Sequence, residues 1–136
     1  MHTVGTFAPG TLEDASEQYE LVGPAAQTVV REVAKSMDFD REEYADRVSR
    51  DVVETARDAL FASLLEVRVG TRKEYEDWRE AYDGEVIEAG SEHVDHVVWH
   101  AAPTGEAVAA TFQEKEEAAI ATLRRQAFGR LYRDQL

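Results

Sequence analysis

The chain has no cysteine among its 136 residues. This absence excludes disulfide bonds, thiolate-bound metals, iron–sulfur clusters and cysteine nucleophiles. No apolar run approaches the roughly 20 residues that span a bilayer, and residues 1–7 lack the basic and apolar regions of a signal peptide. The sequence therefore predicts a cytoplasmic protein without a membrane segment. The length of 136 residues predicts a single domain over residues 1–136, and a hydrophobic content of 43% is enough to fill one core.

Lysine is scarce as well, because 12 of the 15 basic residues are arginine. The 28 acidic residues give a net charge of −13 and are spread through amphipathic segments. One interpretation is an ordinary acidic protein that its charge keeps soluble. The other is adaptation to molar salt, where the Debye length falls to about 3 Å and carboxylate repulsion is screened. The scarcity of lysine favours salt adaptation, and the acidity then says little about function.

Helical periodicity predicts three helices within about residues 11–64. Thr11 is the expected N-cap of the first helix, and Gly23 its expected C-cap. Pro24 then opens the second helix. Asp40 begins a capping box for the third and longest helix, which runs without a break to the end of this region. The second helix carries apolar residues at helical spacing: Ala26, Val29, Val30, Val33 and Met37.

The second half of the chain, about residues 65–136, changes period. Alternation predicts a strand at 65–69, and Thr71 with Glu74 forms a capping box for the helix that follows. The remaining pattern predicts strands near 86–87, 94–101 and 107–112, a turn at 102–105, and a final helix at 113–132. The order α-α-α-β-α-β-β-β-α indicates an α+β fold, with the N-terminal helices packed on a small, largely antiparallel sheet.

Four segments carry a resemblance to a known family: GPAAQTVVREVA at 23–34, DVVETARDALF at 51–61, VVWH at 97–100 and TLRRQAFGR at 122–130. They resemble a small family of uncharacterised haloarchaeal proteins, over nearly the full length. The resemblance implies a halophilic archaeal source and a domain of unknown function. It implies no activity, cofactor or site residue.

Three histidines, His93, His96 and His100, lie close together in the sequence. On a straight strand the Cα atoms of His96 and His100 are about 13 Å apart, which is too far for one metal ion. We therefore predict no metal site. Both histidines lie on the strand face opposite Trp99 and are candidates for a ligand pocket. The alternative interpretation is that they are solvent-side or edge histidines on a half-buried strand.

The segment from Ala118 to Leu136, which holds most of the last helix, is locally basic, with Arg124, Arg125, Arg130 and Arg133 against a single acid, Asp134. These arginines are candidates for binding an anion or a partner. Arg124 lies near the apolar stripe and is the best candidate for a partly buried carboxylate pair. The alternatives are complementation of the helix dipole and pairing with acids of neighbouring helices. Binding to nucleic acid is disfavoured, because counterion release loses its driving force at high salt.

No catalytic motif, glycine-rich dinucleotide fingerprint or phosphate loop is present, and we predict no cofactor. The leading hypothesis is a non-enzymatic protein-interaction module that binds a protein partner, with a homodimer as the default. The first alternative is a small enzyme or ligand-binding domain with a pocket near His96 and His100. The second is anion or nucleic-acid contact through the C-terminal arginines.

Overall fold

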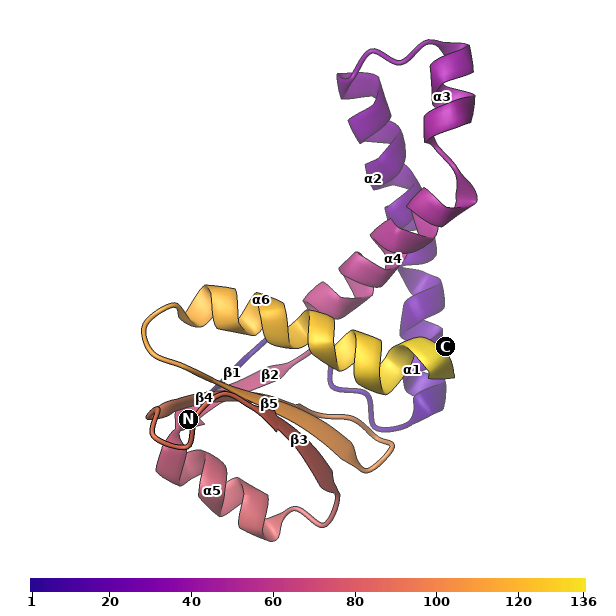
Figure 1. The fold of residues 1–136 in the computed structure, drawn as a ribbon. Helices are drawn as coiled ribbons and strands as arrows, with labels where there is room; N and C mark the ends of the chain where they lie inside the picture. The colour runs from indigo at the N-terminus through magenta and orange to yellow at the C-terminus, as the bar shows by residue number, and fades with distance from the viewer.

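The fold has two parts, a layered body and a helical arm that stands out from it (Figure 1). The structure is a computed structural model that describes residues 1–136. In chain order the elements are β1 (His2–Val4), α1 (Leu12–Leu21), α2 (Gly23–Ser36), α3 (Arg41–Arg47), α4 (Arg50–Leu64), β2 (Val67–Thr71), α5 (Arg72–Ala81), β3 (Glu85–Ala89), β4 (His96–Ala101), β5 (Glu106–Phe112) and α6 (Glu116–Ala127). None of these helices combines the length and the apolar character needed to cross a membrane.

A five-stranded sheet forms the centre of the body, in the order β1-β2-β4-β5-β3. Neighbouring strands are antiparallel except for β3, which runs parallel to β5. β4 and β5 form the predicted hairpin, with His96 opposite Phe112 and Ala101 opposite Ala107. The predicted α+β class and largely antiparallel sheet are therefore confirmed. The predicted element order is incomplete, because it omits the short edge strand β1.

Helices cover both faces of the sheet (Figure 1). α6 lies over one face, where α1 and the end of α4 complete the larger hydrophobic core. Phe61 of α4 is fully buried there, and its ring makes an edge contact with that of Tyr132 at 5.5 Å between centroids. α5 covers the other face, where Tyr75 packs on the fully buried Trp99 at 5.2 Å. Because adjacent strand residues point to opposite faces, Val98 faces α6 while Trp99 faces α5.

The arm consists of α2, α3 and the first half of α4. α2 packs on α4 and, at its base, on α1, whereas α3 lies at the tip, away from the sheet. The base is held by a short network. The Arg57 guanidinium lies over the Tyr19 ring at 4.2 Å and donates from Nε to the Tyr19 carbonyl at 2.7 Å, and the Tyr19 hydroxyl donates to Asp58 at 2.6 Å. The prediction that the N-terminal helices pack on the sheet thus fits α1 and the end of α4 but not α2 or α3.

The predicted long helix from Asp40 to Leu64 is wrong, because the chain forms two helices there. Val48 leaves the helical region at φ −95° and ψ 81°, and the Ser49 hydroxyl then accepts a hydrogen bond from the Val52 amide at 3.2 Å. Ser49 is therefore the N-cap of α4, since its side chain satisfies an amide that has no partner within the helix. The capping residues Thr11, Asp40 and Thr71 are confirmed, each accepting from the amide three residues on.

Two further boundaries differ from the prediction. Gly23 is the first residue of α2 rather than a C-cap, and the Arg57 guanidinium lies 3.4 Å from where a side chain would begin. The last helix begins at Glu116, not at residue 113, and passes after Ala127 into a π-helical turn at Phe128–Tyr132. Phe128, Leu131 and Tyr132 of this turn are all buried in the core.

Replacing Ser49 with alanine removes the cap that begins α4. We expect Ser49→Ala to lower the free energy of unfolding by about 1 kcal/mol, measured by chemical denaturation followed by circular dichroism. Ser63→Ala is the matched control, because the Ser63 hydroxyl donates to the Leu60 carbonyl inside α4 and caps nothing. Equal losses in the two variants would contradict the assignment of Ser49 as the cap.

Candidate functional site

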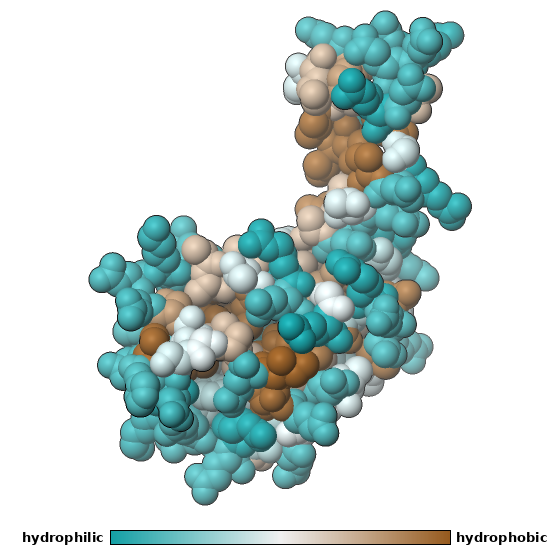
Figure 2. All heavy atoms as spheres, viewed as in Figure 1, coloured by the Kyte–Doolittle hydropathy of each residue, from teal (hydrophilic) through white to brown (hydrophobic).

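An apolar groove runs along the arm between α2 and α4, and Figure 2 shows the apolar side chains gathered there. Large side chains that water can reach form its rim, namely Val29 (45% exposed), Val33 (55%), Met37 (58%) and Val52 (42%). Ten of the twelve lining residues are hydrophobic: Val29, Val30, Val33, Ala34, Met37, Phe39, Val48, Val52, Ala56 and Ala59. The groove is thus an apolar face that no other part of the chain covers.

α2 leaves this face open because it carries two parallel apolar stripes. Ala26, Val30 and Ala34 recur every four residues and are buried in the arm. Val29, Val33 and Met37 also recur every four residues, on the strip of the helix next to the first one, and they are exposed. A helix that packs on one partner helix needs only one such stripe. The second stripe is the signal in the sequence that could have identified the groove, but the five residues were read as one apolar set at helical spacing.

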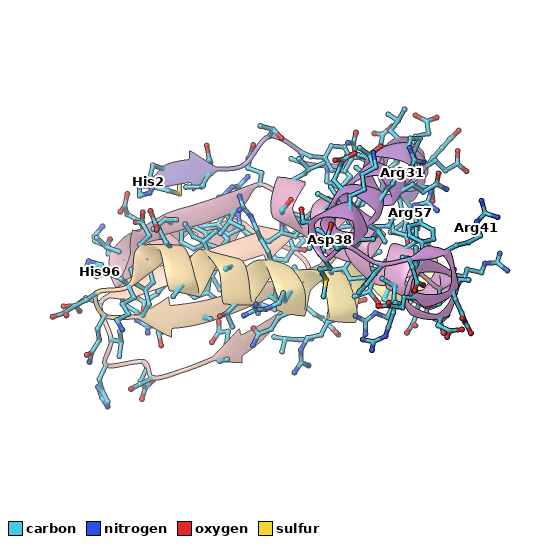
Figure 3. All side chains as sticks on the ribbon, turned by 90° about the horizontal axis from the view of Figure 1, so that it is seen from above. His2, Arg31, Asp38, Arg41, Arg57 and His96 are labelled. Carbon is cyan, nitrogen blue, oxygen red and sulfur yellow. The ribbon has the colours of Figure 1, made fainter.

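Charge is distributed unevenly between the arm and the body. Residues 23–64 hold six of the 15 basic residues and nine of the 28 acidic ones, so the arm is nearly balanced in sign. Figure 3, seen from above the arm, shows Arg31 and Arg41 at its periphery. Arg47 lies near the groove, with its guanidinium 5.9 Å from the Phe39 ring centre. The groove thus has an arginine at its edge, and arginine is enriched in surfaces that bind protein.

His100 is 3% exposed and bridges two layers of the body. Its Nδ1 lies 2.6 Å from the Glu66 carbonyl, and its Nε2 lies 2.6 Å from the Tyr132 hydroxyl. Since a carbonyl can only accept, Nδ1 carries the hydrogen and Nε2 accepts from the tyrosine. Burial lowers the pKa of His100, and the hydrogen bond to the Glu66 carbonyl raises it in part. The positive charges of Arg68 and Arg124 lower it further. His100 is therefore a neutral structural bridge, not the solvent-side residue of the alternative interpretation.

His96 is exposed, and its ring stacks on Phe112 at 5.4 Å. It borders a polar hollow with His2, Glu74 and Glu116, at the end of the sheet far from the arm (Figure 3). The hollow beside His100 is separate and measures only about 40 Å³, whereas ligand pockets usually measure about 300–1,000 Å³. The two histidines share a strand face as predicted, but they do not line one pocket. No group of histidines and carboxylates in the chain could hold a metal ion.

The four C-terminal arginines do not form one site. Arg124 donates to two carbonyls, those of Leu65 at 3.0 Å and Val4 at 3.2 Å, so the predicted carboxylate pair is wrong. These bonds tie α6 to the residue that ends α4 and to the last residue of β1. The other three arginines, Arg125, Arg130 and Arg133, are exposed, and Arg133 lies over the Phe128 ring at 5.4 Å.

The comparisons with known proteins give one match. The model described as "Family of unknown function (DUF5809)" matches residues 6–133, nearly the whole chain. The resemblance to a family without known activity is therefore confirmed, whereas the haloarchaeal source stays a prediction. No curated protein and no solved structure matches.

The buried bridge makes stability depend on pH. An unfolded histidine has a pKa of about 6.5, and burial lowers that of folded His100. The unfolded chain therefore binds the proton more readily, and stability should be complete above pH ~6.5 and fall as the pH drops below it. Between pH 7.5 and 5.5 the unfolding free energy of the wild type should fall. We expect a smaller fall in His100→Phe and an unchanged fall in His96→Gln. An unchanged decline in His100→Phe would contradict the bridge.

Proposed function

We propose that this chain, which belongs to the DUF5809 family of unknown function, is a non-enzymatic protein-interaction module. Its docking surface is the apolar groove of the arm, and the occupant is an amphipathic helix of a protein partner. The larger hollows of the body have a far more polar lining than this groove. The polar hollow at His96 measures about 340 Å³, which is ligand-sized, but it is separate from the small one at His100, so the two histidines do not line the single pocket of the ligand-binding alternative.

The observation that carries this proposal is the clustering of exposed apolar side chains. Eight large hydrophobic residues are exposed in the whole chain, and four of them line this one groove. The others include Leu21 and Ile87, which lie singly elsewhere. Single exposed apolar residues are normal on a soluble protein, whereas a continuous patch bordered by charge is typical of an interaction surface.

The form of the groove supports a helix as the occupant. Its walls are two helices, and the α4 wall is lined by small side chains at Thr55, Ala56 and Ala59. Small residues allow a third helix to approach closely, and its apolar side chains would fill the space between the walls. The partner helix of this proposal therefore carries Val, Leu, Ile or Met at helical spacing. α2 itself has such a stripe, so a second copy of the chain qualifies.

The cytoplasmic, salt-adapted setting is part of the same proposal. Of the 28 acidic side chains, only Glu32, Glu54, Glu74, Asp77 and Glu116 lie within 4 Å of a cationic group. The remaining carboxylates repel one another at low ionic strength, and molar salt screens that repulsion. Screening also lets two acidic proteins approach each other, which a helix-binding module requires.

A charge placed in the groove should abolish binding without unfolding the body. We expect wild-type protein in molar KCl to capture at least one specific protein from a lysate of its source organism. Val33→Glu should lose it, because the carboxylate would be buried in the interface. Leu21→Glu is the matched control, since Leu21 is 71% exposed outside the groove. Mass spectrometry of the three eluates is the measurement, and identical sets from all three would contradict the docking surface.

Unpaired carboxylates should make the fold depend on salt. Raising KCl from 0.1 M to 2 M should raise Tm by about 10 °C, equivalent to roughly 2–3 kcal/mol for a chain of this size. Differential scanning calorimetry measures the shift. Chloride is the chosen anion because sulfate also strengthens apolar burial and would mix two effects. A Tm that stays constant or falls would be incompatible with salt adaptation.

A further inference from the structure

We propose that the helix that fills the groove comes from a second copy of this chain, and that the two arms pack antiparallel about a two-fold axis. The bodies then lie at opposite ends of a bundle built from α2 and α4 of both copies. This inference rests on the docking surface proposed above and adds the identity and direction of the partner. A two-fold interface brings the same surface together from both copies, so one groove must be complementary to itself.

The distribution of side-chain size along the groove supplies that complementarity. The large side chains Met37 and Phe39 lie at the tip of the arm, where α2 ends. The small ones, Ala56 and Ala59, lie toward the base, because α4 begins below α3 and runs toward the body. Antiparallel arms place the large residues of each copy against the small residues of the other, which fills the space evenly. The α2 wall is less graded, since Val29 and Val30 lie below Ala34, but parallel arms would still place Met37 and Phe39 of both copies together at the tips.

Net charge favours the same direction where salt does not screen it. The arm carries six basic and nine acidic residues, whereas the other 94 residues carry nine basic and nineteen acidic ones. Two copies therefore approach with least repulsion through their arms. At low ionic strength parallel arms would bring the two strongly acidic bodies side by side, while antiparallel arms separate them by the length of the bundle, and molar salt screens most of this difference. The groove is thus the surface of this chain on which self-association meets least electrostatic opposition.

The size of the patch agrees with a modest dimer rather than a permanent one. The groove has twelve lining residues, and a stable interface usually uses about 20–30 residues on each side. Charged neighbours on α2, α3 and α4 would supply the rest as a polar rim. Salt that screens the remaining repulsion should strengthen such a dimer, in contrast to one held by ion pairs.

The absence of native cysteine allows a direct test of direction by disulfide crosslinking. Met37→Cys and Ala59→Cys are prepared as separate proteins, mixed in molar KCl and oxidised mildly. Each protein carries a single cysteine, so every disulfide that forms joins two copies. We expect the mixture to form a crosslinked dimer at least about tenfold faster than either protein by itself, a rate ratio that corresponds to ~1.4 kcal/mol. Leu21→Cys measures the rate of random collision, because Leu21 is exposed outside the groove.

Each other outcome overturns the inference. Rapid crosslinking of Met37→Cys with itself would show that the tips meet and the arms are parallel. A mixture that reacts no faster than Leu21→Cys would show that copies do not associate through the groove. If Val33→Glu still abolishes capture of another protein in that case, the docking surface stands and only self-association is overturned. If capture is also unaffected, both proposals are overturned.

Discussion

One helix, α4, belongs to two environments, and the rest of the structure depends on how it is fixed. Its last turns bring Phe61 into contact with the rings of Phe7, Tyr19, Phe128 and Tyr132, all within 6.0 Å between centroids. Its first turns pack mainly on α2. The aromatic cluster therefore holds α4 firmly at one end, and the helix extends from the body as a support for the arm. The clamp of Arg57 on Tyr19 fixes the angle at which it leaves.

Because α4 is held only at its body end, the arm exposes every apolar side chain that α2 and α4 do not bury against each other. α2 buries Ala26, Val30 and Ala34 in the arm, and its second stripe faces water. Leaving four large apolar side chains about half exposed gives up several kcal/mol of burial that a closed fold would gain. A second helix pair that packs on the groove would recover that free energy. The arm is thus incomplete in the same way that one half of a helix bundle is incomplete.

Local signals in the sequence predicted much of this fold, since each depends on residues three or four apart. The caps at Thr11, Asp40 and Thr71 and the hairpin of β4 and β5 are of this kind. The break at Ser49 was missed because Val48 and Val52 continue the four-residue apolar spacing across it. The role of His100 was missed because its partners, Glu66 and Tyr132, lie 34 and 32 residues away. Periodicity also shows that Val33 faces an apolar surface, but not which chain supplies that surface.

The central claim is that the arm completes itself with a second copy, and the molar mass in solution tests it most directly. Light scattering coupled to size exclusion in molar KCl, over a range of loading concentrations, should show a mass that rises from one chain of 15.3 kDa toward two. Val33→Glu should remain at one chain throughout, while Leu21→Glu should follow the wild type. A wild-type mass of one chain at every concentration would contradict the account.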